Sequence, residues 1–168
     1  MLLVAVAAAA AAHHFRPRPG GGDTDSLFKS RCVAVTDGDT IKVLRHGREE
    51  RVRLNGIDCP EKGQPFGTQA KQATSDLVFG KTVTVEVRDV DRYGRLVADV
   101  ALPSGVRVNE ELVRQGMAWW YREYAKDNAT LAQLESEARS ARRGLWASRD
   151  SIAPWEWRKR EKAEPAAR

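Results

Sequence analysis

The stretch "VAVTDGDTIKVLRHGREERVRL" at residues 33–54 decides the fold class of this chain. Its apolar residues recur at every second position and form three pairs: Val33 with Val35, Ile41 with Val43, and Val52 with Leu54. Period-two spacing with polar residues between is typical of strands that bury one face. Asp-Gly at residues 37–38 and His-Gly at residues 46–47 suit short loops between antiparallel strands. We therefore expect three antiparallel strands joined by tight turns.

The next segments alternate between helical and strand patterns. Apolar residues recur at helical spacing from Phe66 to Leu77 and Gly80 follows, which predicts a helix over about residues 66–79. "TVTVEVR" (82–88) and "RLVADVA" (95–101) return to period two and predict two more strands. The tally so far is five strands and one helix.

Two further helices are expected after the last strand. "NEELVRQGM" reads as a short helix capped by Asn109. "TLAQLESEARSARRG" reads as a longer helix, with Thr130 and Gln133 spaced as a capping box and Gly144 as its stop. The resulting fold class is α+β, mainly β: a five-stranded OB-type Greek-key barrel with three helices.

The chain of 168 residues is long enough for one domain with a hydrophobic core. We expect that domain to span residues 27–157, with Trp155 and Trp157 docked on it. Residues 16–26 are rich in Pro and Gly and read as a linker, and residues 158–168 as a charged, disordered tail.

The first residues, "MLLVAVAAAAAA" at 1–12, form an apolar run too short to span a bilayer. The run suits the hydrophobic region of a signal peptide, although a basic segment before it is missing. We expect residues 1–26 to contain a signal peptide and linker, which makes the protein secreted or periplasmic. If the start site is misassigned, the alternative is a cytoplasmic protein.

Charge and cysteine content limit the binding partners and the cysteine chemistry that this chain can have. Lys and Arg number 28 and Asp and Glu 23, so the net charge is +5, which favours a polyanion such as nucleic acid or an anionic membrane face. Cys32 and Cys59 match no metal-ligand spacing and form no disulfide scaffold. Cys32 lies in an apolar strand pattern and reads as a buried free thiol.

Acidic residues gather at two strand ends. Asp39 lies in "DGDT" at the first turn, and Asp58 and Glu61 lie at the end of the third strand. Ca²⁺ and Mg²⁺ prefer oxygen ligands of this kind. Asp-Gly turns and acids beside proline are also ordinary loop composition, so each acid alone is weak support for a metal site.

Two arginines could complete such a site. Arg53 projects away from its apolar neighbours five residues before Asp58, and Arg95 follows a Tyr-Gly turn. A guanidinium matches phosphate oxygens bidentately and can neutralise charge that develops in a transition state. Solvated surface arginines are the alternative reading.

Four segments in order resemble the staphylococcal nuclease (thermonuclease) family: "VTDGDTIKV", "RVRLNGIDCPE", "DRYGRLVADV" and "VNEELVRQGMAWWY". The resemblance runs from about residue 28 to Trp157. It implies Ca²⁺-dependent cleavage of DNA and RNA that leaves 3′-phosphate ends. It also implies that Asp39 and Asp58 bind the metal by their side chains and Cys59 by its backbone carbonyl. Many relatives have Thr or Ala in place of Cys59, a change that a backbone ligand tolerates.

The same resemblance assigns the remaining roles. Glu61 would activate or orient the attacking water, and Arg53 and Arg95 would grip the scissile phosphate. Tyr93 and Tyr124 match positions that contact the nucleotide, whereas Arg122 replaces a second such tyrosine. The loop after Glu61 is shorter than in the staphylococcal enzyme.

"WWYREYAK" at 119–126 interleaves aromatic and basic residues, which suits base stacking, although Trp119 or Trp120 can equally fill the core. The protein is expected to be a monomer with no stable membrane span. Two rival functions stay open: a non-catalytic OB-fold module that binds nucleic acid, and an extracellular calcium-binding domain.

Overall fold

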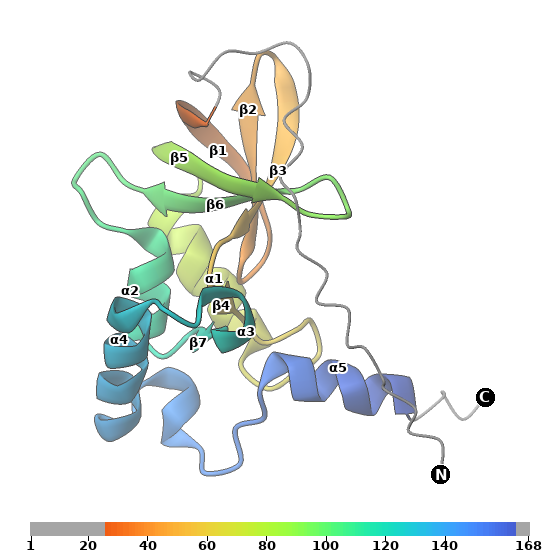
Figure 1. Cartoon of the computed structure of the whole chain (residues 1–168), viewed down its shortest axis with the longest axis vertical. Helices are drawn as coiled ribbons and strands as arrows, with labels where there is room; N and C mark the ends of the chain where they lie inside the picture. Colours follow the sequence, from red (N-terminus) through yellow and green to blue (C-terminus); the bar gives the residue numbers. More distant parts are fainter. Residues whose placement is uncertain (1–25, 164–168) are drawn as a thin grey trace, which may run out of the picture.

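A computed structural model of the chain describes residues 26–163, and its central feature is a closed five-stranded barrel. The strand order is β1-β2-β3-β6-β5 (Figure 1). β3 and β6 run parallel and the other neighbours are antiparallel. The strands are β1 (Leu27–Asp37), β2 (Thr40–Arg45), β3 (Arg48–Leu54), β5 (Thr82–Val90) and β6 (Leu96–Ala101). The barrel that the sequence predicts is therefore confirmed.

The barrel interior follows the period-two pattern on most strands. Ile41, Val43, Val52 and Leu54 are buried, as the alternation predicts. On β1 the pairing with β2 shifts register between Cys32 and Ala34. Cys32, before the shift, is a buried free thiol as predicted, whereas the predicted pair after it, Val33 and Val35, is only half-buried.

The two predicted turns are present. The Asp37-Gly38 step joins β1 to β2, and His46 and Gly47 join β2 to β3 with φ values of 50° and 74°. Two consecutive positive φ values give the twist that a tight hairpin needs. The hairpins place β3 beside β2 with Thr40 opposite Arg53, which matters for the site below.

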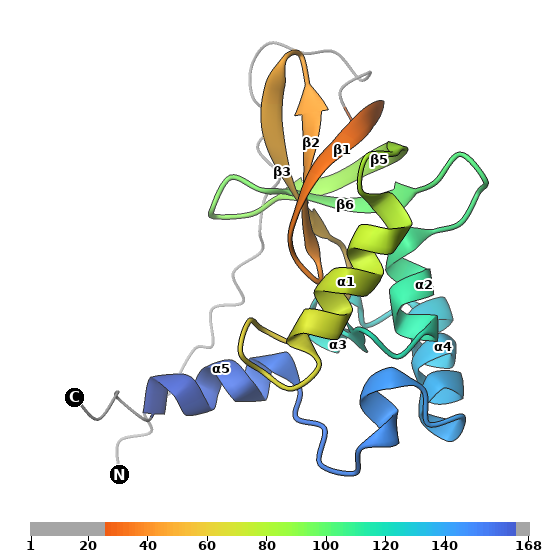
Figure 2. The same ribbon diagram turned by 180° about the vertical axis from the view of Figure 1, so that it is seen from behind.

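Helices cover one end of the barrel, opposite the tip of the β2–β3 hairpin (Figures 1 and 2). The predicted helix at 66–79 is α1 (Gly67–Val78), and the two later ones are α2 (Val108–Arg114) and α4 (Ala129–Ser140). Within residues 26–163 there are five α-helices rather than the three expected. The additional ones are α3 (Arg122–Ala125) and α5 (Pro154–Ala163), and a 3₁₀ turn, η2 (Gly144–Ala147), lies between α4 and α5.

The predicted helix caps are wrong. Asn109 lies inside α2 and is buried, where its side chain binds the backbone of Val100, Ala98 and Asn55. The cap of α4 is Asn128, which accepts from the Leu131 amide, so Thr130 and Gln133 form no capping box. Gly144 begins η2 instead of ending α4. Local spacing could not distinguish these asparagines, because both precede apolar helical residues.

A short second sheet and an aromatic cluster lie below the barrel. β4 (Ile57–Asp58) pairs with β7 (Trp119–Trp120). Trp119 and Trp146 pack edge to face with ring centroids 4.4 Å apart, beside Leu145 and Ala153. This cluster packs β7, α4 and η2 against the start of α5.

The tail expected to be disordered from residue 158 is helical as far as Ala163 in α5. Pro154 occupies its first position, Glu156 lies in its first turn, and Arg160 and Lys162 lie in its last turn, all favourable for a helix. The predicted signal peptide and nearly all of the linker lie outside the described residues, and the domain boundaries stay predictions. Within residues 26–163, no helix combines the length and apolarity needed to cross a membrane.

Candidate active site

Asp39 is held against the exit of β4 by the turn that carries it. The Cys59 amide donates to Asp39 Oδ2 at 2.8 Å, and the Thr40 hydroxyl donates to Oδ1 at 3.2 Å. A Cβ at Gly38 would lie 2.6 Å from the Cβ of Cys59. Only glycine therefore lets this turn approach Cys59 so closely, and the approach places Asp39 beside Asp58.

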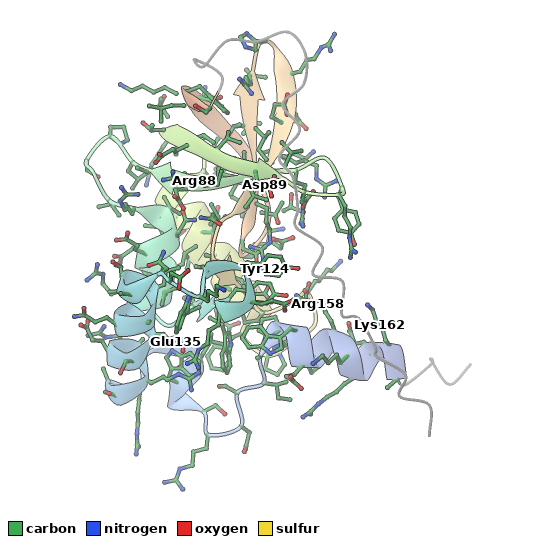
Figure 3. All side chains as sticks on the ribbon, in the orientation of Figure 1. Arg88, Asp89, Tyr124, Glu135, Arg158 and Lys162 are labelled. Atoms are coloured by element: carbon green, nitrogen blue, oxygen red, sulfur yellow. The ribbon has the colours of Figure 1, made fainter. Side chains whose placement is uncertain are left out.

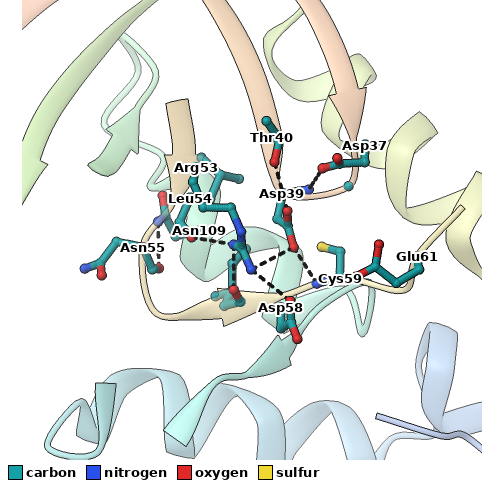
Figure 4. Close-up of polar contacts among 12 residues, drawn as sticks. Asp37, Asp39, Thr40, Arg53, Leu54, Asn55, Asp58, Cys59, Glu61 and Asn109 are labelled. Atoms are coloured by element: carbon teal, nitrogen blue, oxygen red, sulfur yellow. Dashed lines mark hydrogen bonds and ion pairs between the residues drawn. The ribbon is translucent and has the colours of Figure 1, made fainter. Parts of the chain in front are cut away.

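Arg53 lies between the two aspartates (Figure 4). Its Nη2 is 3.1 Å from Asp39 Oδ2 and 2.8 Å from Asp58 Oδ1. Its Nη1 donates to the carbonyls of Leu54 and Ile57, each at 2.8 Å. Burial disfavours the charged form, but Asp39 and Asp58 outweigh it, so the pKa of Arg53 lies above its ordinary value. The guanidinium is thus a fixed cation in the site.

Two buried carboxyl groups in this cluster are hard to ionise. Burial is the main cause that raises the pKa of Asp58 to about 6, with the charge of Asp39 adding to it, even though Arg158 and Arg53 act in the other direction. Burial and the charge of Asp39 likewise raise the pKa of Asp37 to about 6. Asp37 belongs to the "DGD" turn, but we did not predict it as part of the site.

Glu61 is positioned by the loop that follows it. Its amide donates to the side chain of Gln64 at 3.0 Å, and the Gln64 amide donates back to the Glu61 carbonyl at 3.0 Å. A Cβ at Gly67 would lie only 2.1 Å from that carbonyl oxygen, so the start of α1 also depends on glycine. The carboxylate of Glu61 contacts Arg158, with Oε1 2.5 Å from Nη1.

Arg158 is the second residue of the site, after Asp37, that the sequence did not predict. Its Nη2 is 2.8 Å from Asp58 Oδ2, so one guanidinium on α5 joins Asp58 to Glu61. It lies 100 and 97 residues from these partners. No local spacing could reveal such a contact, and the only signal was the expected docking of Trp155 and Trp157.

Arg95 and Tyr93 lie apart from the acidic cluster. Arg95 precedes β6, the strand beside β3, and its Nε is 2.6 Å from Asp91 Oδ2. Within the described chain, no contact joins Arg95 to Asp39, Asp58 or Glu61. Tyr93 is 63% exposed, and the guanidinium groups of Arg92 and Arg95 lie 4.9 and 5.5 Å from its ring centre.

The segment 119–126 divides between core and surface. Trp119 is buried in the aromatic cluster, and the indole of Trp120 donates to the Ala125 carbonyl at 2.9 Å. Tyr124 is 70% exposed, with its ring 4.7 Å from that of Tyr121. The core interpretation is therefore correct for Trp119, while Tyr124 presents a free aromatic face.

The cluster fits a hard divalent cation by its donor set and charge. Among the described residues in contact, four carboxylates (Asp37, Asp39, Asp58 and Glu61) face two arginines, Arg53 and Arg158. Two negative charges remain when all six groups are ionised, and a divalent cation would favour the ionised form of the two aspartates whose pKa values burial raises. The Cys59 thiol is buried, which raises its pKa and keeps it a neutral, poor ligand.

No set of three His, Cys, Asp or Glu side chains within residues 26–163 is arranged around a metal position. A cation would therefore be held by the carboxylates of Asp39 and Asp58 together with backbone and water oxygens. The carbonyl of Cys59, whose amide already contacts Asp39, stays the predicted backbone ligand.

Known proteins resemble this chain over most of its length. The chain is 46% identical over 131 residues to an "Uncharacterized endonuclease" of Escherichia coli O157:H7, covering 78% of this chain and 85% of that protein. It is 42% identical to a "Micrococcal nuclease" of Shigella flexneri (80% and 83% covered) and to an "Uncharacterized endonuclease" of Haemophilus influenzae (81% and 76% covered). The family model "Staphylococcal nuclease homologue" matches residues 51–148. The chain belongs to the staphylococcal nuclease family.

Proposed function

We propose that this nuclease hydrolyses phosphodiester bonds of DNA and RNA with Ca²⁺ as cofactor and leaves 3′-phosphate ends. The observation that carries the proposal is the convergence of Arg53 with the carboxylates of Asp39 and Asp58, with Glu61 bound through Arg158 at the rim. A fixed cation and oxygen ligands for a metal are what an anionic phosphodiester requires for attack. The names of the relatives support the same reaction class.

The side chains divide the chemical work. Glu61 accepts the proton of the attacking water, and Arg53, whose Nη1 and Nη2 already have two partners each, binds a non-bridging oxygen of the phosphate through Nε as negative charge grows there. Bound Ca²⁺ would add positive charge at the phosphate and make nearby water easier to deprotonate. Arg95 acts on the same phosphate or the leaving oxygen, which requires its guanidinium to leave Asp91.

The substrate strand has aromatic and basic contacts available. Tyr93 and Tyr124 are both exposed and can stack on bases, which is tolerant of sequence. The net charge of +5 adds attraction to the phosphate backbone that should weaken as salt rises. Little sequence specificity is expected from such contacts.

The test is digestion of plasmid DNA, single-stranded DNA and RNA with Ca²⁺ and with chelator. We expect cleavage only with Ca²⁺, and products that a polymerase extends only after phosphatase treatment, because a 3′-phosphate blocks extension. Undiminished cleavage in chelator would remove the metal from the reaction, and directly extendable ends would overturn the product assignment. Salt-sensitive binding without cleavage would select the non-catalytic module instead.

We also propose that the protein is exported and acts as a monomer. The apolar run at residues 1–12 supports export, and N-terminal sequencing of the mature protein from its host tests it. A mature protein that begins at Met1 would contradict export. A mass in solution of about twice the 18.7 kDa chain would contradict the monomer.

A further inference from the structure

The helix α5 is attached to the candidate active site at its amino-terminal end. The ring of Trp155 stacks on Tyr121 with centroids 5.3 Å apart and an interplanar angle of 2°, and it meets Trp119 edge to face at 5.6 Å. Just before the helix, the side chain of Gln64 donates to the Ile152 carbonyl at 2.7 Å. Gln64 belongs to the loop that positions Glu61, so the same loop carries the proposed base and anchors α5.

From this anchor, α5 carries Arg158 onto the proposed metal ligand and the proposed base. Figure 3 shows Arg158 between α5 and the segment that carries Tyr124. Its Nη2 is 2.8 Å from Asp58 Oδ2, and its Nη1 is 3.3 Å from Asp58 Oδ1 and 2.5 Å from Glu61 Oε1. Because Arg53 also binds Oδ1, both oxygens of Asp58 already have guanidinium partners.

This arrangement conflicts with the use of the same oxygens in hydrolysis. A cation that takes Asp58 as a ligand must replace or rearrange the Arg158 contact, since two positive groups cannot share those lone pairs without repulsion. Arg158 also holds Oε1 of Glu61, so only Oε2 of the proposed base is left for water. With α5 docked, both oxygens of Asp58 and one oxygen of Glu61 are therefore already bound to guanidinium groups.

The contact of Arg158 with the carboxylates is more exposed than that of Arg53 and is therefore easier to displace. The Arg53 side chain is 14% exposed and bound to two carbonyls inside the barrel wall, whereas the Arg158 side chain is 34% exposed. The carboxyl-terminal end of α5 projects from the body of the molecule (Figure 1), and residues 159–163 are exposed. Such a peripheral element opens at lower free energy than the barrel.

We propose that α5 is an autoinhibitory gate, in which Arg158 occupies the carboxylates of Asp58 and Glu61 until a divalent cation displaces it and the helix undocks. The proposal rests on the proposed function for the identity of the cation. Because coupling between two binding events is reciprocal, a docked α5 weakens cation binding and bound cation weakens docking.

Isothermal titration of the full chain with Ca²⁺, in the absence of nucleic acid, tests whether docked α5 weakens cation binding. We expect Arg158→Ala and Trp155→Ala each to bind Ca²⁺ about tenfold more tightly than the unaltered chain, within the usual range of coupling. Arg160→Ala, an exposed arginine on the same helix, should leave the affinity unchanged. Trp155→Ala distinguishes release of α5 from simple removal of a positive charge, because it keeps every charge and removes the ring packing that docks the helix. An increase in Arg158→Ala alone would mean simple charge removal and would overturn the gate.

Hydrogen exchange of the unaltered chain tests whether bound cation undocks α5. This measurement does not depend on the folding of any variant. We expect the amides of residues 156–163 to exchange at least about tenfold faster in saturating Ca²⁺ than in chelator, while those of β2 and β3 stay equally protected. Equal exchange of α5 in both conditions overturns the gate.

The two proposals fail separately. Tighter Ca²⁺ binding in both release variants without any DNA cleavage would sink the nuclease and support the gate. Ca²⁺-dependent cleavage with equal Ca²⁺ affinity in all four proteins would support the nuclease and sink the gate.

Discussion

The guanidinium of Arg53 makes four contacts, two with carboxylates and two with backbone carbonyls. This planar set of donors cannot be reproduced by an ammonium group, which acts as a single point charge. We expect Arg53→Lys to reduce cleavage by about 100-fold or more, because the donor at the phosphate is lost and the two aspartates lose their shared partner. Initial rates at saturating DNA measure the effect.

Arg51 provides the matched control for Arg53. It lies on the same strand two residues earlier, but its side chain is exposed. Arg51→Lys should keep a near-normal rate. Equal rates for the two variants would remove Arg53 from the reaction.

Glu61 is proposed to work only on the attacking water. Glu61→Gln keeps the shape of the side chain but cannot accept a proton, so we expect kcat to fall about 100-fold or more with DNA binding largely intact. Single-turnover rates and DNA affinity, measured in parallel, separate an effect on hydrolysis from an effect on binding. Glu137→Gln on the exposed face of α4 is the control, and a near-normal rate for Glu61→Gln would assign the base role elsewhere.

At the scale of elements, Asn109 is not the helix cap that local spacing predicts, and Asn128, which was not predicted, is one. Asn128 caps α4, and its replacement by Ala should cost about 1 kcal/mol of unfolding free energy. Asn109→Ala should cost about 3 kcal/mol, because buried groups of β6 and of the β3–β4 turn lose their partners. Urea unfolding of both variants tests which of them loses more unfolding free energy. A larger loss for Asn128→Ala would contradict the structure.

Elements defined by local pattern were largely predictable. The alternation of apolar residues located the barrel strands, and helical spacing located α1 to within one residue at each end. The burial of Cys32 was predicted, but the register shift on β1 that leaves Val35 half-buried was not predictable. It depends on how β1 pairs with both β2 and β5, and a single strand's sequence carries no record of its partners' register.

At the scale of the whole molecule, the excess of acid in the site makes stability depend on pH. Asp37 and Asp58 have pKa values of about 6 in the folded protein, above the ordinary value of 3.8. Between these values the folded state binds more protons than the unfolded state. Their stabilising contribution is therefore complete below about pH 4 and is lost as pH rises through about 6.

Asp37→Asn isolates this effect in chelator. Asn keeps an oxygen for the Asp39 amide but carries no charge. We expect the variant to match the unaltered chain near pH 4 and to exceed it at pH 7 by up to about 3 kcal/mol of unfolding free energy. Urea unfolding at the two pH values measures the difference, with the exposed Asp127→Asn as control. A gain that is equal at both pH values would exclude proton linkage as the cause.

The sequence by itself determined the barrel and the convergence of Asp39, Arg53 and Asp58. These residues lie within 20 positions of one another, and hairpin register places Arg53 opposite Thr40, next to Asp39. Only the tertiary structure decided that Arg158 contacts Asp58 and Glu61. The Arg158 contact depends on Trp155 packing between Tyr121 and Trp119. Packing between segments so distant in sequence arises from the assembled fold and leaves no local pattern to read.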